Sequence, residues 1–167
     1  MIRDFQDSDK EAFLRLNDIF VHWLSPLDEK RLKYILARAN YARCAVDPLT
    51  DDMIGALISY PHTVDDPDHC NIAWLRQTLD AFQYIDRVIV SASAQGKGVG
   101  RRLYADLEHF ASQRGLPHLA CEVNTRPDNP ASHAFHIHQG FHAIGDRDFP
   151  EKDTAVRYYA KKLQSVS

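Results

Sequence analysis

Cysteine is scarce in this 167-residue chain, in which Cys44, Cys70 and Cys121 stand far apart. Three cysteines at wide, odd spacing argue against a disulfide framework and against a zinc site. No apolar run approaches the ~20 residues that a membrane-spanning helix needs. The opening residues, MIRDFQDSDKEAF, carry acids where a signal peptide has an apolar segment. We therefore expect a soluble, cytoplasmic protein that has no membrane partner.

Excess positive charge is also absent. The chain has 20 Lys and Arg against 23 Asp and Glu, which gives a net charge of -3 and a pI near 6.3. A broad basic surface is thereby excluded, and no nucleic-acid partner is expected. The chain also has no internal repeat, low-complexity tract or linker. Its length suits one domain with a substantial core, so we expect a single domain over residues 1–167.

Hydrophobic periodicity then predicts the elements of this domain. Ser8, with Glu11 three residues later, has the pattern of a capping box, and the helix that it begins should carry Trp23 on its apolar face. Helices are expected over 8–24, 28–39, 72–79, 98–113 and 129–139, and strands over 1–3, 41–46, 53–60, 83–90, 118–124, 141–145 and 155–161. The central strand–helix–strand order predicts one parallel pair with a right-handed crossover inside a mixed sheet.

The stretch SASAQGKGVGRRLY, residues 91–104, places three glycines between a strand and a helix. A mononucleotide P-loop and a dinucleotide-binding fingerprint both need a different residue where Arg101 stands. Unpaired N–H groups at a helix N-terminus still form a site for an anion. Lys97, Arg101 and Arg102 suit a polyanion such as a pyrophosphate. The alternative is a glycine-rich connection whose basic side chains are only solvated.

Two motifs resemble those of the GNAT superfamily of N-acetyltransferases. Gln95-x-x-Gly98-x-Gly100 follows a strand that ends Val88-Ile-Val90, and Asn129-Pro-Ala-Ser132 opens a helix that ends in Gly140-Phe141. The element order is similar along nearly the whole chain. The strands Tyr-Ile-Asp-Arg-Val and Cys-Glu-Val-Asn are similar to those of bacterial members of unassigned function. One departure is Gln-Gly at 95–96 in place of the common Arg-Gly, a variant within the pattern.

The resemblance implies a fold and a co-substrate. The fold is α/β: a twisted, mixed, mostly antiparallel sheet with one splayed parallel central strand pair and helices on both faces. The co-substrate is acetyl-CoA. The resemblance places Val88, Ile89 and Val90 along the pantetheine arm, Gln95, Gly96, Lys97, Gly98, Val99, Gly100, Arg101 and Arg102 at the pyrophosphate, and Asn129 and Ser132 toward the pantetheine or a phosphate.

Three residues are candidates for proton transfer. Glu122 matches the base of ribosomal-protein acetylating relatives. His136 stands four residues before Gly140, where many relatives carry a tyrosine that protonates the leaving thiolate. Asp86 is the rival base, or an anchor for the substrate ammonium. Structural alternatives stay open for each: an exposed acid for Glu122, a buried helix-face histidine for His136, and a salt bridge with Arg87 for Asp86.

The resemblance implies transfer of an acetyl group from acetyl-CoA to a primary amine of a small molecule, by direct attack. No metal is expected, because His133, His136, His138 and His142 lack a Cys or acid that would complete a ligand set. The long acidic segment 61–79 is expected to form the acceptor-side wall, and it favours a small acceptor over a peptide groove. A protein or peptide N-terminal acetyltransferase, a non-catalytic CoA-binding sensor domain and a homodimer remain open.

Overall fold

The computed structural model of the chain describes residues 1–164. These residues form two compact units. Unit 1 comprises residues 1–61 and 85–109, and unit 2 comprises residues 62–84 and those from 110 onward. Each unit contains both helices and strands. Among the described residues, no helix has the length and apolar character that crossing a bilayer requires.

Seven strands make one sheet, in the order β1-β2-β3-β4-β5-β7-β6. The pairs β1–β2, β2–β3, β5–β7 and β6–β7 are antiparallel. Within unit 2, β4 (Gln83–Val90) and β5 (His118–Arg126) pair in parallel, with Tyr84 opposite Ala120. The predicted α/β class, with a mostly antiparallel sheet and one parallel pair, is therefore confirmed.

Unit 1 has helices on both faces of its strands. Tyr41 and Arg43 of β2 contact Asp106 of α4, at 2.7 and 2.8 Å, whereas the Cys44 thiol lies 3.7 Å from Asp9. Successive strand residues point to opposite faces, so these contacts place α4 and the Asp9 helix on different sides. The elements are β1 (Ile2–Asp4), η1 (Asp7–Asp9), α1 (Lys10–Ile19), α2 (Glu29–Arg38), β2 (Tyr41–Val46), β3 (Met53–Pro61), most of β4, η2 (Ala92–Ala94) and α4 (Val99–Ser112), whose last turn belongs to unit 2.

The N-terminal helix differs from its prediction at both ends. A 3-10 turn precedes it, and the capping box is formed by Gln6 and Asp9, not by Ser8 and Glu11. Asp9 takes this place because its buried carboxylate also accepts two hydrogen bonds from Arg3, at 2.7 and 2.9 Å. The helix ends at Ile19, so Trp23 lies outside it with 39% of its surface exposed. The predicted apolar face is therefore two turns at most.

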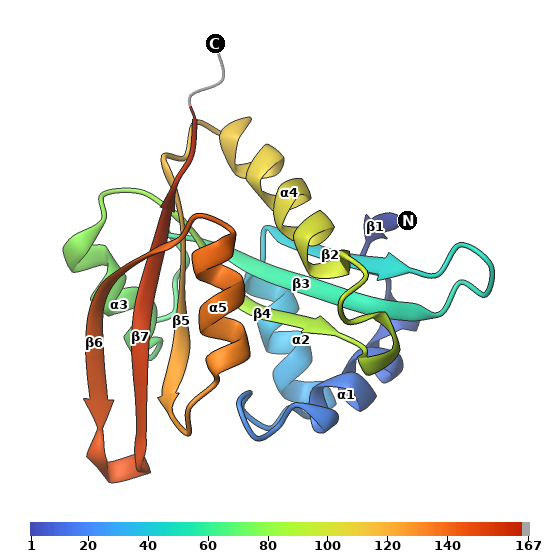
Figure 1. The fold of residues 1–167 in the computed structure, drawn as a ribbon, viewed down its shortest axis with the longest axis horizontal. Coiled ribbons are helices and arrows are strands. Elements are labelled where there is room, and N and C mark those ends of the chain that lie inside the picture. Colours follow the sequence, from blue (N-terminus) through green and yellow to red (C-terminus); the bar gives the residue numbers. More distant parts are fainter. Residues whose placement is uncertain (165–167) are drawn as a thin grey trace. The chain divides into compact units, whose positions relative to one another are not determined.

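Unit 2 is also covered on both faces of its strands. Its elements are α3 (Cys70–Thr78), the start of β4, β5, α5 (Pro130–His138), β6 (His142–Phe149), η3 (Pro150–Lys152) and β7 (Thr154–Lys162). The adjacent residues Tyr158 and Tyr159 show the two sides, because the Tyr158 ring stacks on Trp74 of α3 and the Tyr159 ring stacks on His136 of α5. Below, these two sides are called the α3 face and the α5 face. In Figure 1, β6 and β7 form the long orange-red hairpin of this unit.

Two stretches of unit 2 are more regular than predicted. The helix expected at 72–79 begins at Cys70, because His69 caps it by accepting a hydrogen bond from the Ile72 N–H at 3.3 Å. The strand expected at 141–145 extends to Phe149 as part of the hairpin with β7. Its charged residues Asp146 and Asp148 hid the alternating pattern. Arg157 of β7 and Arg126 of β5 supply ion pairs for them.

Candidate functional site

The glycine turn of unit 1 presents backbone N–H groups at the start of α4. Gly96 and Gly98 both have φ of +74°, a conformation that favours glycine. The first hydrogen bond to a preceding carbonyl at this end runs from the Arg102 N–H to the Gly98 oxygen, at 3.0 Å. Within residues 1–164, the N–H groups of residues 98–101 have no backbone acceptor. This is the arrangement that binds an anion at a helix N-terminus.

Basic side chains surround the same turn. Lys97, Arg101 and Arg102 are exposed, and none forms an ion pair with a carboxylate of the described residues. Cations at this end of a helix are disfavoured by its dipole, by ~0.3–1 kcal/mol each. An anion bound at the turn would reverse that effect, so the turn and its side chains fit a pyrophosphate.

Two contacts fix the turn within unit 1. The Gln95 side chain donates a hydrogen bond to the Val90 carbonyl at 3.3 Å, which ties the turn to the end of β4. Gly55 of β3 allows α4 to approach, since a Cβ there would lie 3.0 Å from both the Ile89 oxygen and the Val99 side chain. Gly55 was missed by the sequence interpretation, although an isolated glycine inside a strand is a known signal of close approach.

Asp86 is engaged in a structural contact. Its carboxylate pairs with Arg87 at 3.2 Å. Arg87 is buried and also donates to the Asn17 side chain and to the Ser25 hydroxyl, the latter at 2.8 Å. These contacts hold the segment that joins α1 to α2. The salt bridge that was left open as a structural role for Asp86 is therefore present.

Glu122 lies on the α3 face of unit 2 and is half-buried. The buried Tyr84 hydroxyl lies 2.7 and 2.8 Å from its two carboxylate oxygens and donates to them. The Tyr84 ring in turn meets the His69 ring edge-on, with centroids 4.9 Å apart. A hydrogen bond to the ionised carboxylate favours its charged form. Tyr84 and His69 were not predicted near Glu122, because they come from different elements.

The rest of the α3 face is aromatic and polar. Tyr158 is opposite Glu122 in the strand register and donates to the Asn71 side chain at 2.7 Å. The Trp74 ring stacks on Tyr158 at 4.0 Å. Burial, and then the Glu122 charge, raise the pKa of Tyr158 to about 12. A Cβ on Gly145 would lie 2.6 Å from the Trp74 ring, so this close packing requires glycine.

His136 lies on the α5 face, on the other side of the strands from Glu122. It is 3% exposed, and its Nδ1–H donates to the Ser132 carbonyl at 2.7 Å. Its ring also packs edge-on against Phe141. Burial lowers the pKa of His136 to about 4. At neutral pH the ring is uncharged and Nδ1 holds its one proton, which weakens the predicted role as an acid and agrees with the buried-histidine alternative.

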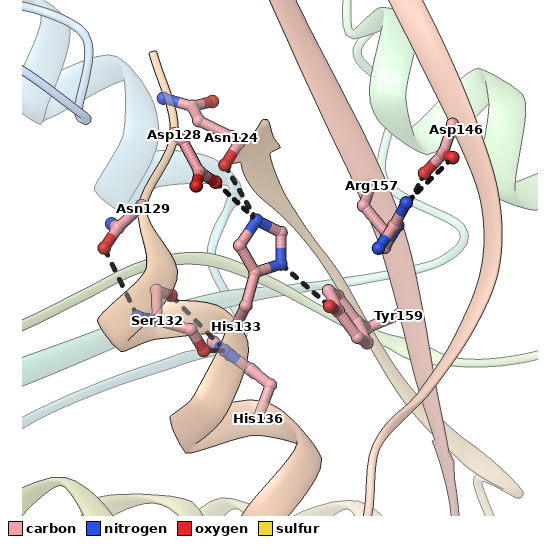
Figure 2. A network of polar contacts seen from close by, with 9 residues as sticks. All are labelled: Asn124, Asp128, Asn129, Ser132, His133, His136, Asp146, Arg157 and Tyr159. Atoms are coloured by element: carbon pink, nitrogen blue, oxygen red, sulfur yellow. Dashed lines mark hydrogen bonds and ion pairs between the residues drawn. The ribbon is translucent and has the colours of Figure 1, made fainter. Parts of the chain in front are cut away.

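Figure 2 shows a polar network that fixes α5 beside β5 and β7. His133 bridges the Tyr159 hydroxyl, at 2.8 Å, and the Asn124 carbonyl, at 2.9 Å. Asn129 caps the helix, as predicted, by accepting a hydrogen bond from the Ser132 N–H at 3.3 Å. These contacts orient the two residues that the sequence assigned to cofactor binding on this helix. That binding role itself stays a prediction.

Metal and thiol chemistry find little support in the described residues. No group of three His, Cys, Asp or Glu within residues 1–164 has the geometry to hold a metal ion. Cys121 is buried, and burial raises the pKa of its thiol well above the ordinary value. A thiol in that state is a poor nucleophile. Candidate groups for chemistry within residues 1–164 include the glycine turn of unit 1 and the Glu122 cluster of unit 2.

Comparisons with known proteins bear on the resemblance that the two sequence motifs show. Residues 4–141 match the model of the Acetyltransferase (GNAT) family. Ribosomal-protein-S18-alanine N-acetyltransferase from Escherichia coli is similar at 17% identity and a TM-score of 0.71, over 100% of this chain and 95% of that chain. Ribosomal-protein-alanine N-acetyltransferase from Brucella melitensis is similar at 23% identity and a TM-score of 0.71, over 98% of this chain and 99% of that chain. A chain of the NatC complex bound to Gag peptide and CoA is similar at 14% identity and a TM-score of 0.76, over 98% of each of the two chains. A search of curated proteins gives no match.

Proposed function

Because the chain belongs to the acetyltransferase (GNAT) family, we propose that it transfers an acetyl group from acetyl-CoA to a primary amine of a small molecule. The observation that carries the proposal is the glycine turn, where positive φ at Gly96 and Gly98 leaves N–H groups before α4 without backbone acceptors. Three basic side chains, which form no ion pair with a carboxylate of residues 1–164, accompany it. Such a turn suits the pyrophosphate of CoA, and the NatC relative was solved with CoA bound.

Acetyl-CoA supplies an activated thioester, at which the amine nitrogen forms the new C–N bond while the C–S bond breaks. Glu122 acts on the acceptor. An alkyl ammonium has a pKa near 10, so only ~0.1% is free amine at pH 7. Glu122 accepts that proton, directly or through a water, and its own charged form is held by the Tyr84 hydroxyl. Asp86 is already paired with Arg87 and is the weaker choice for this role.

His136 has a different part in this proposal from the one that its sequence position suggested. Burial lowers the pKa of His136 to about 4, so the ring is neutral at pH 7. In this proposal the leaving thiolate takes its proton from water. His136 instead packs α5 against β7 through the Tyr159 ring, while its Nδ1–H donates to the Ser132 carbonyl of the same helix.

A small acceptor is favoured by the segment before β4. Arg76 donates to the carbonyls of His62 and Val64, both at 2.6 Å, which holds the start of the segment against α3. Trp74 of α3 then covers Tyr158 beside Glu122. Because the Trp74 ring covers part of the α3 face beside Glu122, a compact acceptor is favoured over a long one. Of the three acids in the segment 61–79, Asp66 is buried, and Asp65 and Asp68 are exposed.

A thiol-release assay tests the proposal. Acetyl-CoA is mixed with the protein and with panels of small amines, amino acids and short peptides, and free CoA is measured. Turnover of small amines with Glu122-dependent rates is expected. Turnover of peptides alone would make it a peptide N-terminal acetyltransferase. Tight CoA binding in calorimetry without thiol release from any acceptor would favour the sensor alternative.

A further inference from the structure

Arg147 of β6 differs from the other arginines of the β5–β7–β6 part of unit 2. Arg157 pairs with Asp146 at 2.8 Å, and Arg126 pairs with Asp148. Within residues 1–164, no carboxylate forms an ion pair with Arg147. Yet Arg147 is half-buried, in a position where an unpaired charge is costly. This makes it a candidate for binding an anion.

The contacts of Arg147 orient its guanidinium without using most of its donors. It lies 4.6 Å from the centre of the Phe149 ring, a cation–π distance. Among the described residues it donates to the Cys70 carbonyl, at 3.4 Å and near the limit for such a bond, and to the Tyr158 side chain. A guanidinium carries five N–H donors in a planar fork that matches a carboxylate.

The strand register places Arg147 on the same face as Glu122. Glu122 is opposite Tyr158, and Tyr158 is opposite Gly145 of β6. Arg147 is two residues beyond Gly145, so it shares the α3 face. Tyr158 belongs to β7, which lies between the strands of the two charges in the sheet. Burial and then Glu122 raise the pKa of Tyr158, while the hydrogen bond from Arg147 lowers it. The face therefore carries one anion and one cation on either side of an aromatic residue.

We propose that Arg147 binds the carboxylate of the acceptor while the acceptor's amine faces Glu122, so that the acceptor is a free amino acid. This inference rests on the proposed function, since it names the substrate class of the same reaction. A zwitterion complements both charges of the α3 face. A bidentate pair with Arg147 would also fix which nitrogen is presented to the base.

The test compares amino acids with their α-carboxamides, which keep the amine and lose the negative charge. Each standard amino acid with a primary amine, and its carboxamide, is assayed for thiol release with wild-type protein, Arg147→Gln and Arg147→Lys. Arg157→Gln is the matched control, because it removes the same charge from the neighbouring strand on the α5 face. Circular dichroism melts establish that each variant is folded.

Wild-type protein should prefer the free acid. Arg147→Gln should raise the KM for it about 10- to 100-fold, the usual loss for a charge-assisted hydrogen bond, with little change for the carboxamide. The KM of Arg147→Lys for the free acid should lie between those of wild type and Arg147→Gln, and the KM of Arg157→Gln should equal that of wild type. Equal use of acids and carboxamides by wild type, or equal losses in both substrates from Arg147→Gln, overturns the inference and leaves the proposed function standing. If no acceptor is turned over, the proposed function fails, and calorimetry of the same amino acids then decides: no binding, or binding unaltered in Arg147→Gln, overturns the inference.

Discussion

The two units carry sites of opposite character. In unit 1, the glycine turn offers backbone N–H groups and positive charge, and the Gln95 side chain ties it to the end of β4. In unit 2, the Glu122 cluster is built from side chains alone, and its contacts join residues far apart in the chain, such as Tyr84 with Glu122 and Asn71 with Tyr158. A backbone site should tolerate changes in its side chains and fail when its glycines change. A side-chain site should respond to the loss of single atoms.

The largest effect is expected for Glu122→Gln. Removing a general base costs ~10²–10⁴-fold in rate, and the acidic limb of the pH–rate profile should disappear. Affinity for acetyl-CoA, measured by calorimetry, should be unchanged because the glycine turn is intact. Glu151→Gln serves as the control, since this glutamate is exposed and belongs to η3. A wild-type rate for Glu122→Gln across pH 6 to 9 would move attention to Asp86.

Gly98→Asp should break the site of unit 1 without touching that of unit 2. It puts a side chain at φ +74° and a negative charge at the turn, so acetyl-CoA affinity should fall by at least 10- to 100-fold, the loss of one or more charge-assisted bonds. Gly115→Asp is matched in backbone strain, at φ +67° at the end of α4, with no atom within 4 Å of the new Cβ. If both variants bind acetyl-CoA equally, the turn is not the anion site.

Tyr84→Phe sharpens the comparison because it removes one oxygen atom. The hydroxyl favours the ionised form of Glu122, so its loss should raise the pKa of the carboxyl. The acidic limb should then move to higher pH, with the rate at pH 8.5 nearly unchanged. Tyr41→Phe is the control, because it breaks a similar phenol–carboxylate bond, to Asp106, in unit 1. An unshifted limb would mean that Tyr84 only packs.

The smallest effect on rate is expected for His136→Phe, which should stay within a few-fold of wild type. Its signature is in stability. The pKa of His136 falls from 6.5 to about 4 on folding, so the unfolded chain binds the proton more readily. Wild type should therefore lose stability as the pH falls below 6.5, by about 1 kcal/mol between pH 6.5 and 5.5. Urea unfolding of His136→Phe should lack this loss, and an equal loss in both proteins would contradict the burial argument.

Most of the fold could be predicted from the sequence, and so could those parts of the site that are formed by consecutive residues. The glycine turn is written in eight consecutive residues, and the cap at Asn129 in four, so spacing alone indicated both. The capping box at the N-terminus was misassigned because Asp9 is selected by Arg3, a contact that no helical pattern contains. Local chemistry is readable where the backbone itself makes the feature.

The partners of Glu122 were beyond such reasoning. Alternation indicated which face of β5 carries Glu122. Tyr84 meets Glu122 only through the register of the parallel pair, and His69 meets Tyr84 only through the packing of α3. For His136, the motif gave the position but not the burial, and burial is what changes its acid strength. Arg147 gave no signal at all, since an unpaired arginine looks like any other in a charged strand.

Because Gly145 has no side chain, the position of the Trp74 ring over Tyr158 can be altered by substitution. Adding one methyl group there would place carbon 2.6 Å from the indole, so alanine at 145 must push Trp74 and the start of α3 outward. Combining alanine at 145 with a smaller side chain at 74 would remove the clash and leave a cavity beside Glu122. Acceptor size could thus be re-engineered by a matched pair of substitutions in unit 2, while the glycine turn of unit 1 keeps its backbone and its charges.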